Sequence, residues 1–406
     1  MDYWTKFPAP DSLEEQSLKI EKPEKGHLPL INGHLHTPYS FSAFASAEQA
    51  IDLAAKENIK VAGINDFNTV NGYADWAKAC LAHGIAPLFN IEMIGLNTED
   101  QAQNLRVNDP STPGRTYISG KGLSTNPLPD DVKNWLNIAV NKSNGQCEKM
   151  TQLLNNHLKA NKAPFVLNFN EIYEQLTLGQ VRERHIARAL RLKVEETFPS
   201  EQEQMHFYKQ ITGEEISVSD PAIVENTLRG ALLKAGGPAF IAEDPNAFAD
   251  VDTIRNLILK AKGIPTYPFL GDALNGKCTD FEEELEITMK KLNERGFYSV
   301  EFITTRNSLS YLEETVPKLW NNGFLVTFGT EHNTAAMEPL VPKAKGGVAL
   351  SENLLWINFQ SVSIILAHQY LTAKTGYGWL DPTSGIPNME NKDKFIKIGW
   401  SIINSA

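Results

Sequence analysis

Short apolar runs alternate with amphipathic segments in the first quarter of the chain. The runs at residues 28–36, 59–64 and 85–91 predict strands. Between them, a capping-box pattern that starts at Ser46 predicts the beginning of a helix, and a second helix is expected over residues 73–83. Alternation of this length predicts a mostly parallel sheet, open or closed.

The same order of elements returns late in the chain. Each of three helices is expected to end at a glycine, which takes the left-handed conformation common after a helix, and to lead into a strand. The helices are predicted at 251–262, at 280–295 from a capping box at Thr279, and up to about Asn322. The strands that follow are predicted at 264–269, 297–303 and 324–328.

The middle of the chain breaks this order. Residues 97–114 are polar and contain two prolines, which predicts a long loop. Residues 126–249 have helical periodicity with charged faces, notably at 181–193 and 222–235, and are interpreted as an inserted helical subdomain.

The two ends are expected to lie outside the alternating part. Residues 1–26 are polar and are predicted to form an N-terminal extension outside the core. Residues 351–406 are interpreted as a C-terminal helical extension, whose apolar run at 361–371 suits a packed helix and is too short for a membrane span. The alternating part is therefore divided into residues 27–125 and 250–350.

Composition excludes some classes of function. The chain has 406 residues and a net charge of −11, which argues against nucleic acid as a partner because phosphate-backbone binding needs clustered Lys and Arg. Three distant cysteines, Cys80, Cys147 and Cys278, indicate no disulfide framework or zinc knuckle. With no apolar leader and no run of 18 apolar residues, we expect a cytoplasmic protein without membrane contact.

Histidine and acidic residues lie at the ends of predicted strands, where side chains of a β/α barrel converge on one site. They are His34, His36, Asp66, Glu92, Glu331 and His332. Histidines two apart on a strand point the same way, so His34 and His36 can hold one ion together. Imidazoles with carboxylates suit a divalent metal, which indicates a metallohydrolase.

Structural alternatives remain for each of these groups. His34 and His36 could be hydrogen-bonded strand histidines, and Glu92 could pair with an arginine. Asp66 could orient an imidazole or act as a general base, or it could cap the helix that follows it.

The motifs around these residues resemble those of the PHP (polymerase and histidinol phosphatase) family of metal-dependent phosphoesterases, over roughly residues 27–350. Residues 33–40 (GHLHTPYS) are similar to its first motif and residues 63–72 (GINDFNTVNG) to its second. Residues 90–92 (NIE) and 329–332 (GTEH) resemble its G-x-E and GSD-x-H motifs. Residues 184–190 (RHIARAL) are similar to a segment of small nucleotide and phosphoamino-acid phosphoesterases with a helical insertion here.

The resemblance implies one preserved metal site. Its ligands would be His34, His36, Glu92 and Glu331. Glu331 replaces the family's aspartate, and its longer side chain could reach the metal or only the water bound to it. We therefore expect one divalent ion, with zinc favoured by the two imidazoles and iron or manganese as alternatives.

The other two metals of the family lack ligands here. Tyr117 and Tyr267 stand where the second metal would take histidines, and a phenol is a poor ligand at neutral pH. Phe41 and Phe67 stand at third-metal positions, which leaves only His332 there. The two tyrosines are predicted to line the substrate site, with core packing as the alternative.

Catalytic and binding roles follow from the same resemblance. Asp66 or His332 would move the proton, although His332 could instead only pack beside the site. Arg184, His185 and Arg188 would hold a substrate phosphate from the insertion. The alternative for this helix is a solvated basic face.

We therefore expect an α/β fold, a distorted parallel (β/α)7-type TIM-like barrel of the PHP kind with an inserted helical cap. The predicted function is a metal-dependent, phosphoesterase-like hydrolase that acts on a small anionic substrate through a metal-activated water. The alternative is a catalytically weak or inactive PHP-like protein that binds a metal and a small ligand. A third possibility is amidohydrolase-like or glycoside-directed hydrolysis at a single zinc.

Overall fold

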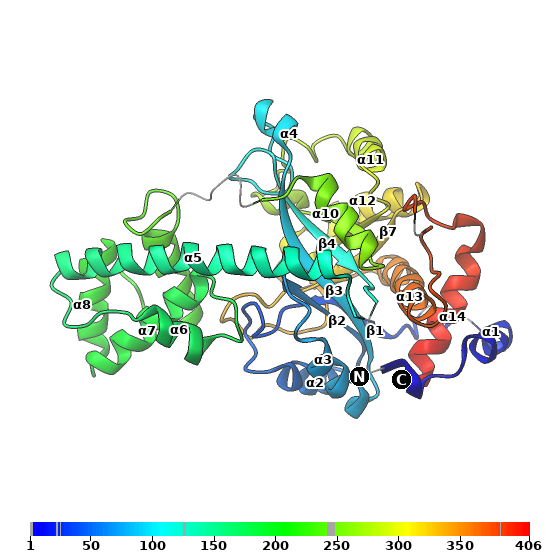
Figure 1. The fold of residues 1–406 in the computed structure, drawn as a ribbon, viewed down its shortest axis with the longest axis horizontal. Helices are drawn as coiled ribbons and strands as arrows, with labels where there is room; N and C mark the ends of the chain where they lie inside the picture. Colours follow the sequence, from blue (N-terminus) through cyan, green and yellow to red (C-terminus); the bar gives the residue numbers. More distant parts are fainter. Residues whose placement is uncertain (1–2, 22, 25, 125–126, 242–247, 382) are drawn as a thin grey trace.

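A single seven-stranded sheet organises the computed structural model, which describes residues 3–21, 23–24, 26–124, 127–241, 248–381 and 383–406 (Figure 1). Its strands lie side by side in chain order. They are β1 (Leu30–Leu35), β2 (Ile59–Phe67), β3 (Ala86–Leu96), β4 (Arg115–Lys121), β5 (Ile264–Phe269), β6 (Ser299–Ile303) and β7 (Leu325–Gly329).

The sheet curls into a distorted barrel. Its two outer strands, β1 and β7, lie side by side, and a parallel bridge joins Leu35 of β1 to Glu331, two residues after β7. All neighbouring strands are parallel except β4, which runs antiparallel to both β3 and β5. The predicted α/β, TIM-like barrel is confirmed, and the reversed β4 is its distortion.

Helices cover the outside of the barrel at the predicted places. They are α2 (Ala47–Lys56), α3 (Tyr73–His83), α10 (Val251–Lys260), α11 (Leu285–Glu294) and α12 (Leu309–Asn321). Ser46 caps α2 by accepting a hydrogen bond from the backbone N–H of Gln49, as its pattern predicted. The capping box predicted at Thr279 is wrong, because Glu282 instead accepts hydrogen bonds from the backbone of Leu270 and Gly271. The region predicted as a long loop also contains a short helix, α4 (Thr98–Ala102).

The middle of the chain forms a separate group of helices. The 31-residue helix α5 (Asp130–Ala160) runs from the barrel to this group (Figure 1). The group contains α6 (Phe169–Leu176), α7 (Glu183–Thr197), α8 (Glu201–Thr212), α9 (Pro221–Leu228) and a π-helical turn (Arg229–Leu233). Its hydrophobic core is distinct from that of the barrel. The limits of 126–249 for this insertion stay a prediction, and residues 125–126 and 242–247 lie outside the described residues.

The N-terminal segment packs into the barrel core. It forms a 3-10 turn (Tyr3–Lys6) and α1 (Pro10–Lys19). Tyr3 and Trp4 are buried, and the Trp4 ring meets Tyr370 edge-on at 5.4 Å. The prediction that residues 1–26 lie outside the core is wrong for these aromatic residues. The segment is polar on average, but burial of its aromatic side chains stabilises its packing on the barrel.

The C-terminal segment is also part of the barrel. It contains α13 (Glu352–Thr375) and α14 (Lys392–Ser405), after two short strands β8 (Lys343–Ala344) and β9 (Val348–Ala349). Asn358 and Ser361 of α13 accept hydrogen bonds from the backbone N–H groups of Phe328 and Val326 in β7. This helix thus satisfies the free edge of β7, which β1 leaves largely unpaired. Within the described residues, no helix combines the length and apolar character that a membrane crossing requires.

Candidate metal centre

Three buried donors converge inside the barrel mouth. His34 lies near the end of β1, His36 directly follows that strand, and Glu92 lies in β3. The Nε2 atoms of the two histidines are 3.2 Å apart. Glu92 Oε2 lies 3.3 Å from the His36 nitrogen and 3.7 Å from that of His34. The Glu92 oxygen is buried and has no hydrogen-bond partner among the described residues.

These distances fit a single small divalent ion. Nitrogen and oxygen ligands about 2.0–2.1 Å from a tetrahedral ion lie about 3.3 Å from one another. Two of the three donor distances, 3.2 and 3.3 Å, match that spacing, and the third is 3.7 Å. The unpartnered Glu92 oxygen is a polar atom that an ion would satisfy. Burial raises the pKa of Glu92 in spite of the nearby His34, so the carboxylate needs a cation to remain charged.

Glu331 is not part of this cluster. Among the described residues, the grouped donors are His34, His36 and Glu92. Glu331 forms an ion pair with Arg306, a residue that sequence reasoning missed. Burial alone would raise the pKa of Glu331, but Arg306 and the two imidazoles outweigh it and lower that pKa. In this structure Arg306 compensates the charge of Glu331, and the role of Glu331 as a fourth ligand stays a prediction.

A buried ion pair orients His34 from behind. Glu301 Oε2 lies 3.0 Å from His34 Nδ1, and Lys121 Nζ lies 2.5 Å from the same oxygen. A carboxylate that accepts from one ring nitrogen leaves the other nitrogen free to bind a metal. Burial opposes ionisation of Glu301, but Lys121 and His34 lower its pKa far below the usual range.

Sequence reasoning missed both partners of this pair. Lys121 and Glu301 are each only 1% exposed. A signal was present, because Glu301 is the one charged residue of the otherwise uncharged run at 297–303.

Asp66 anchors the turn that carries His36. It accepts hydrogen bonds from the Thr37 backbone at 2.8 Å and from Ser40 Oγ at 2.6 Å. Ser40 Oγ is in turn 3.2 Å from His36 Nδ1, whereas Asp66 itself is 3.9 Å from that atom. This arrangement suits the orienting role, while helix capping is excluded because Gly72 precedes α3. A part for Asp66 in proton transfer stays a prediction.

His332 faces away from the cluster. Its ring stacks on Phe44 at 5.1 Å, and its two nitrogens lie within 2.9 Å of Thr330 Oγ1 and the Glu338 carbonyl. With both nitrogens hydrogen-bonded, the contacts of His332 favour the packing alternative, and a part for His332 in proton transfer stays a prediction.

The insertion reaches the barrel through two aromatic rings. Phe67 stacks on His36 at 5.1 Å, and the Arg182 guanidinium lies 4.0 Å from the same ring. Phe41 meets His185 at 4.8 Å and Arg188 at 4.3 Å. Arg188 of α7 and Arg182, the N-cap residue of that helix, thus form cation–π contacts with Phe41 and Phe67. These two rings stand at the positions that the family resemblance assigns to a third metal.

Two predicted substrate-binding residues have structural contacts instead. His185 is buried and its Nδ1 accepts a hydrogen bond from the Arg182 backbone, which caps α7. Arg188 donates to the Ser42 carbonyl at 3.3 Å and lies 3.5 Å from Glu225. These contacts favour structural roles, and substrate binding by His185 and Arg188 stays a prediction.

A cavity of about 460 Å³ lies between α5, β4 and the start of α7. Its lining is strongly cationic: Arg115, Lys142, Lys149, Arg182, Arg184, Arg229 and Lys234, with Glu183. Arg229 and Lys234 pair with Glu183, and Arg184 donates to Asn226. Within the described part of the chain, Arg182 has no ion pair. The sequence analysis did not predict Arg182 as a site residue.

The two tyrosines predicted to line the substrate site lie in different environments. Tyr117 lines this cavity, and its ring meets Phe67 edge-on at 6.2 Å. Tyr267 is 1% exposed, donates a hydrogen bond to Glu282 and lines neither described cavity. The prediction that Tyr267 lines the site is therefore corrected, because its hydroxyl is satisfied within the core.

Comparison with known proteins agrees with this architecture. Residues 32–176 match the family model of the PHP domain. A structure of a candidate metal-dependent phosphoesterase from Bifidobacterium adolescentis aligns with a TM-score of 0.54 and 13% identity, over 84% of this chain and 98% of that one.

An amidohydrolase from Chromobacterium violaceum, solved with bound sulfate and no metal, aligns with a TM-score of 0.52 and 16% identity. That alignment covers 81% of this chain and 96% of the other. No curated protein matches the sequence. At these identities the two structures show the fold alone, whereas the family model identifies a PHP domain within the chain, at residues 32–176.

Proposed function

We propose that this protein is a metal-dependent hydrolase that cleaves a phosphoester of a small anionic substrate. The observation that carries the proposal is the pairing of the His34–His36–Glu92 cluster with a cation-lined cavity at the same mouth. Tyr117 lies in this cavity and contacts Phe67, which in turn stacks on His36, so the cluster and the cavity are joined by direct contacts.

Each residue has a defined task in this proposal. His34, His36 and Glu92 would hold one divalent ion, and Glu301 with Lys121 fixes the ring of His34. A bound ion supplies positive charge that polarises a phosphoryl group and activates water. Arg182 and Arg184 would hold the anion through charge-assisted hydrogen bonds.

The comparisons support this class of reaction. One similar structure is described as a candidate metal-dependent phosphoesterase, and the other holds sulfate, a tetrahedral anion like phosphate. Two imidazoles favour zinc, and iron or manganese suit the same donors.

A second candidate function rests on the residues around the cluster that have lost or do not offer free ligand atoms. His332 has both nitrogens hydrogen-bonded, and Phe41 and Phe67 stand at former ligand positions. A lone ion cannot clamp both the attacking and the leaving oxygen. The alternative is therefore a catalytically weak or inactive protein that keeps the metal and binds an anionic ligand.

Metal reconstitution with a phosphomonoester panel tests the proposal. Chelator-treated protein, reloaded separately with zinc, manganese or iron, should hydrolyse at least one phosphomonoester, at a turnover below the roughly 10 per second of a typical enzyme. The His36→Ala variant should be inactive with every metal. Activity that persists in His36→Ala would contradict the proposal. Metal and phosphate binding without turnover would favour the inactive alternative.

A further inference from the structure

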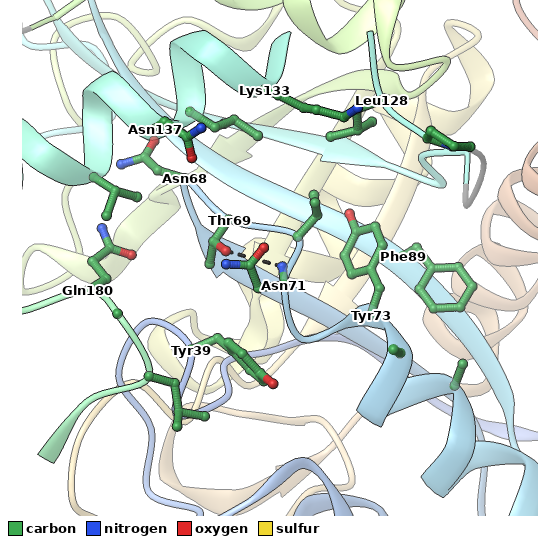
Figure 2. A pocket seen from close by; sticks show the side chains of 18 of the residues that line it. Tyr39, Asn68, Thr69, Asn71, Tyr73, Phe89, Leu128, Lys133, Asn137 and Gln180 are labelled. Atoms are coloured by element: carbon green, nitrogen blue, oxygen red, sulfur yellow. Dashed lines mark hydrogen bonds between the residues drawn. The ribbon is translucent and has the colours of Figure 1, made fainter. Parts of the chain in front are cut away.

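A second cavity, of about 490 Å³, lies on the other side of α5 (Figure 2). Its walls come from the turn after β2, the N-terminal half of α5, residues 127–128 just before α5, and residues 178–180. A volume of this size is typical of pockets for small molecules.

Helix α5 separates this cavity from the cationic one. Its residues Lys133, Leu136, Asn137 and Val140 face the second cavity, whereas Ala139, Lys142, Gln146 and Lys149 face the cationic cavity. At 3.6 residues per turn these two sets lie on roughly opposite faces of the helix. Asn68, which directly follows β2, lines both cavities. The second cavity is thus distinct from the proposed active site.

Buried polar atoms without partners line the second cavity. Gln180 is 1% exposed, and neither its amide oxygen nor its amide nitrogen has a hydrogen-bond partner. The same holds for Asn68 Oδ1 and the Tyr3 hydroxyl, all judged within the described residues. Buried polar groups are nearly always hydrogen-bonded in folded proteins, so four such atoms around one cavity indicate a missing partner.

The cavity is nearly free of charge. Among the described residues that line it, Lys133 alone carries a formal charge, and it is exposed and pairs with Asp130 at 3.4 Å. Burial raises the pKa of Tyr3, so its hydroxyl stays neutral. The contrast with the seven cations across α5 indicates an uncharged ligand.

The two sides of the cavity differ in chemistry. Asn68, Asn137 and Gln180 lie along one side, and the rings of Tyr73 and Phe89 lie along the opposite side (Figure 2). An amide oxygen needs a donor and an amide nitrogen needs an acceptor, and a hydroxyl group can serve as either. The aromatic side suits an apolar ring face.

We propose that this cavity binds a neutral, hydroxyl-rich ring, such as a saccharide. Its hydroxyls would satisfy Gln180, Asn68 and Tyr3, and its C–H face would pack on Tyr73 and Phe89. This inference goes beyond the proposed function, because it assigns a site that lies outside the metal centre and needs no metal.

Saturation-transfer NMR with uncharged saccharides tests the proposal on the full chain. The probes are glucose, galactose, ribose, sucrose and trehalose, with glucose 6-phosphate as the charged counterpart. At least one uncharged saccharide should bind, and Gln180→Leu should weaken its binding at least tenfold. Gln202→Leu, the same change at an exposed position of the insertion, should bind as the wild type does. His36→Ala should also bind normally, since the metal centre is not involved.

Thermal denaturation separates lost binding from lost folding. Without ligand, Gln180→Leu should melt at or above the wild-type temperature, because it replaces two unpartnered buried atoms with apolar ones. Absence of binding by every saccharide would overturn the proposal, and so would binding only of glucose 6-phosphate. Equal binding by Gln180→Leu would do the same, as would loss of binding in His36→Ala. These outcomes leave the phosphoesterase proposal untouched, because that proposal depends on metal and phosphate assays.

Discussion

The barrel and the insertion carry opposite excesses of charge around the same mouth. On the barrel side, four buried acidic residues face two cations and two imidazoles: Asp66, Glu92, Glu301 and Glu331 against Lys121, Arg306, His34 and His36. In the cationic cavity, six Lys and Arg residues of the insertion, together with Arg115 of β4, face Glu183 among the described lining residues.

This difference shows how the two parts divide the work of binding. Glu301 has Lys121, Glu331 has Arg306, and Asp66 accepts hydrogen bonds from the turn that carries His36. Glu92 is left as the carboxylate with an unpartnered oxygen, whose charge awaits a cation. Arg182 is the matching cation of the insertion, and it lies over Phe67 next to His36. A metal on one side and an anion on the other would each offset the charge of the opposite part.

Removing the two imidazoles should have the largest effect. The His34→Ala/His36→Ala variant should lose the divalent ion, of which we expect about one per wild-type chain. Elemental analysis of dialysed protein measures this directly. His83→Ala is the control, because His83 is partly exposed and pairs with Asp52 at 2.7 Å, away from the cluster. Three ions per wild-type chain, or an ion retained by the double variant, would contradict the assignment of a single metal site to the barrel.

Lys121→Met should sharply lower the free energy of unfolding. The substitution leaves the Glu301 carboxylate buried and without its main compensating charge, which costs about 3–5 kcal/mol. Urea unfolding measures the change. Lys121→Met/Glu301→Gln should recover most of the loss because no buried charge remains. Lys193→Met, which removes an exposed pair with Glu196, should change stability by less than about 1 kcal/mol. Equal losses in the single and double variants would contradict this explanation.

Sequence patterns predicted the barrel because its elements are locally encoded. The apolar runs, the cap at Ser46 and the left-handed Gly296 and Gly323 each act within a few residues, and the structure has them where expected. After α10, Lys262 rather than the expected Gly263 takes the left-handed conformation. The H-x-H spacing and the lone acidic residue of an apolar strand likewise predicted His34, His36 and Glu92 as neighbours. Their distances confirm that they converge, and metal binding itself stays a prediction.

Contacts between distant segments were beyond such patterns. Lys121 and Glu301 are 180 residues apart in sequence, and only the closed sheet brings them together beneath His34. The contacts of Glu331 and His332 could not be predicted from motif position for a related reason. Both residues have positive φ, so the chain turns sharply after β7 and directs their side chains to Arg306 and Phe44. A motif fixes order in the chain, whereas the backbone path decides where a side chain points.

Acid should weaken the barrel through His368. Burial lowers its pKa to about 4, and the neutral ring accepts a hydrogen bond from the Trp379 backbone and lies 2.8 Å from the Lys262 carbonyl. The unfolded chain takes up this proton near pH 6.5, so the stabilisation is complete above that pH and is lost as pH falls toward 4. The loss should reach about 3 kcal/mol.

Urea unfolding at several pH values measures this effect. His368→Gln should remove much of the decline between pH 6.5 and 4. In the insertion, His185 is the counterpart, because burial lowers its pKa to about 3 and its Nδ1 caps α7. His185→Gln should therefore reduce acid sensitivity in the insertion, as followed by hydrogen exchange in α7, while leaving α13 unchanged. An unaltered pH profile in both variants would show that these buried histidines do not set the acid response.

Arg182→Met should have the smallest effect of the four, on anion binding rather than on folding. Loss of one charge-assisted contact should weaken phosphate binding by about 1.5–3 kcal/mol, because Arg182 has no competing ion pair within the described residues. Arg188→Met should bind phosphate nearly as the wild type does, since Arg188 is already held by Glu225 and Ser42 outside the cavity. Calorimetric titration with inorganic phosphate, on metal-loaded and metal-free protein, measures both. If the two variants lost affinity equally, the motif-based assignment of Arg188 would be right, and the distinction drawn from the cavity would be wrong.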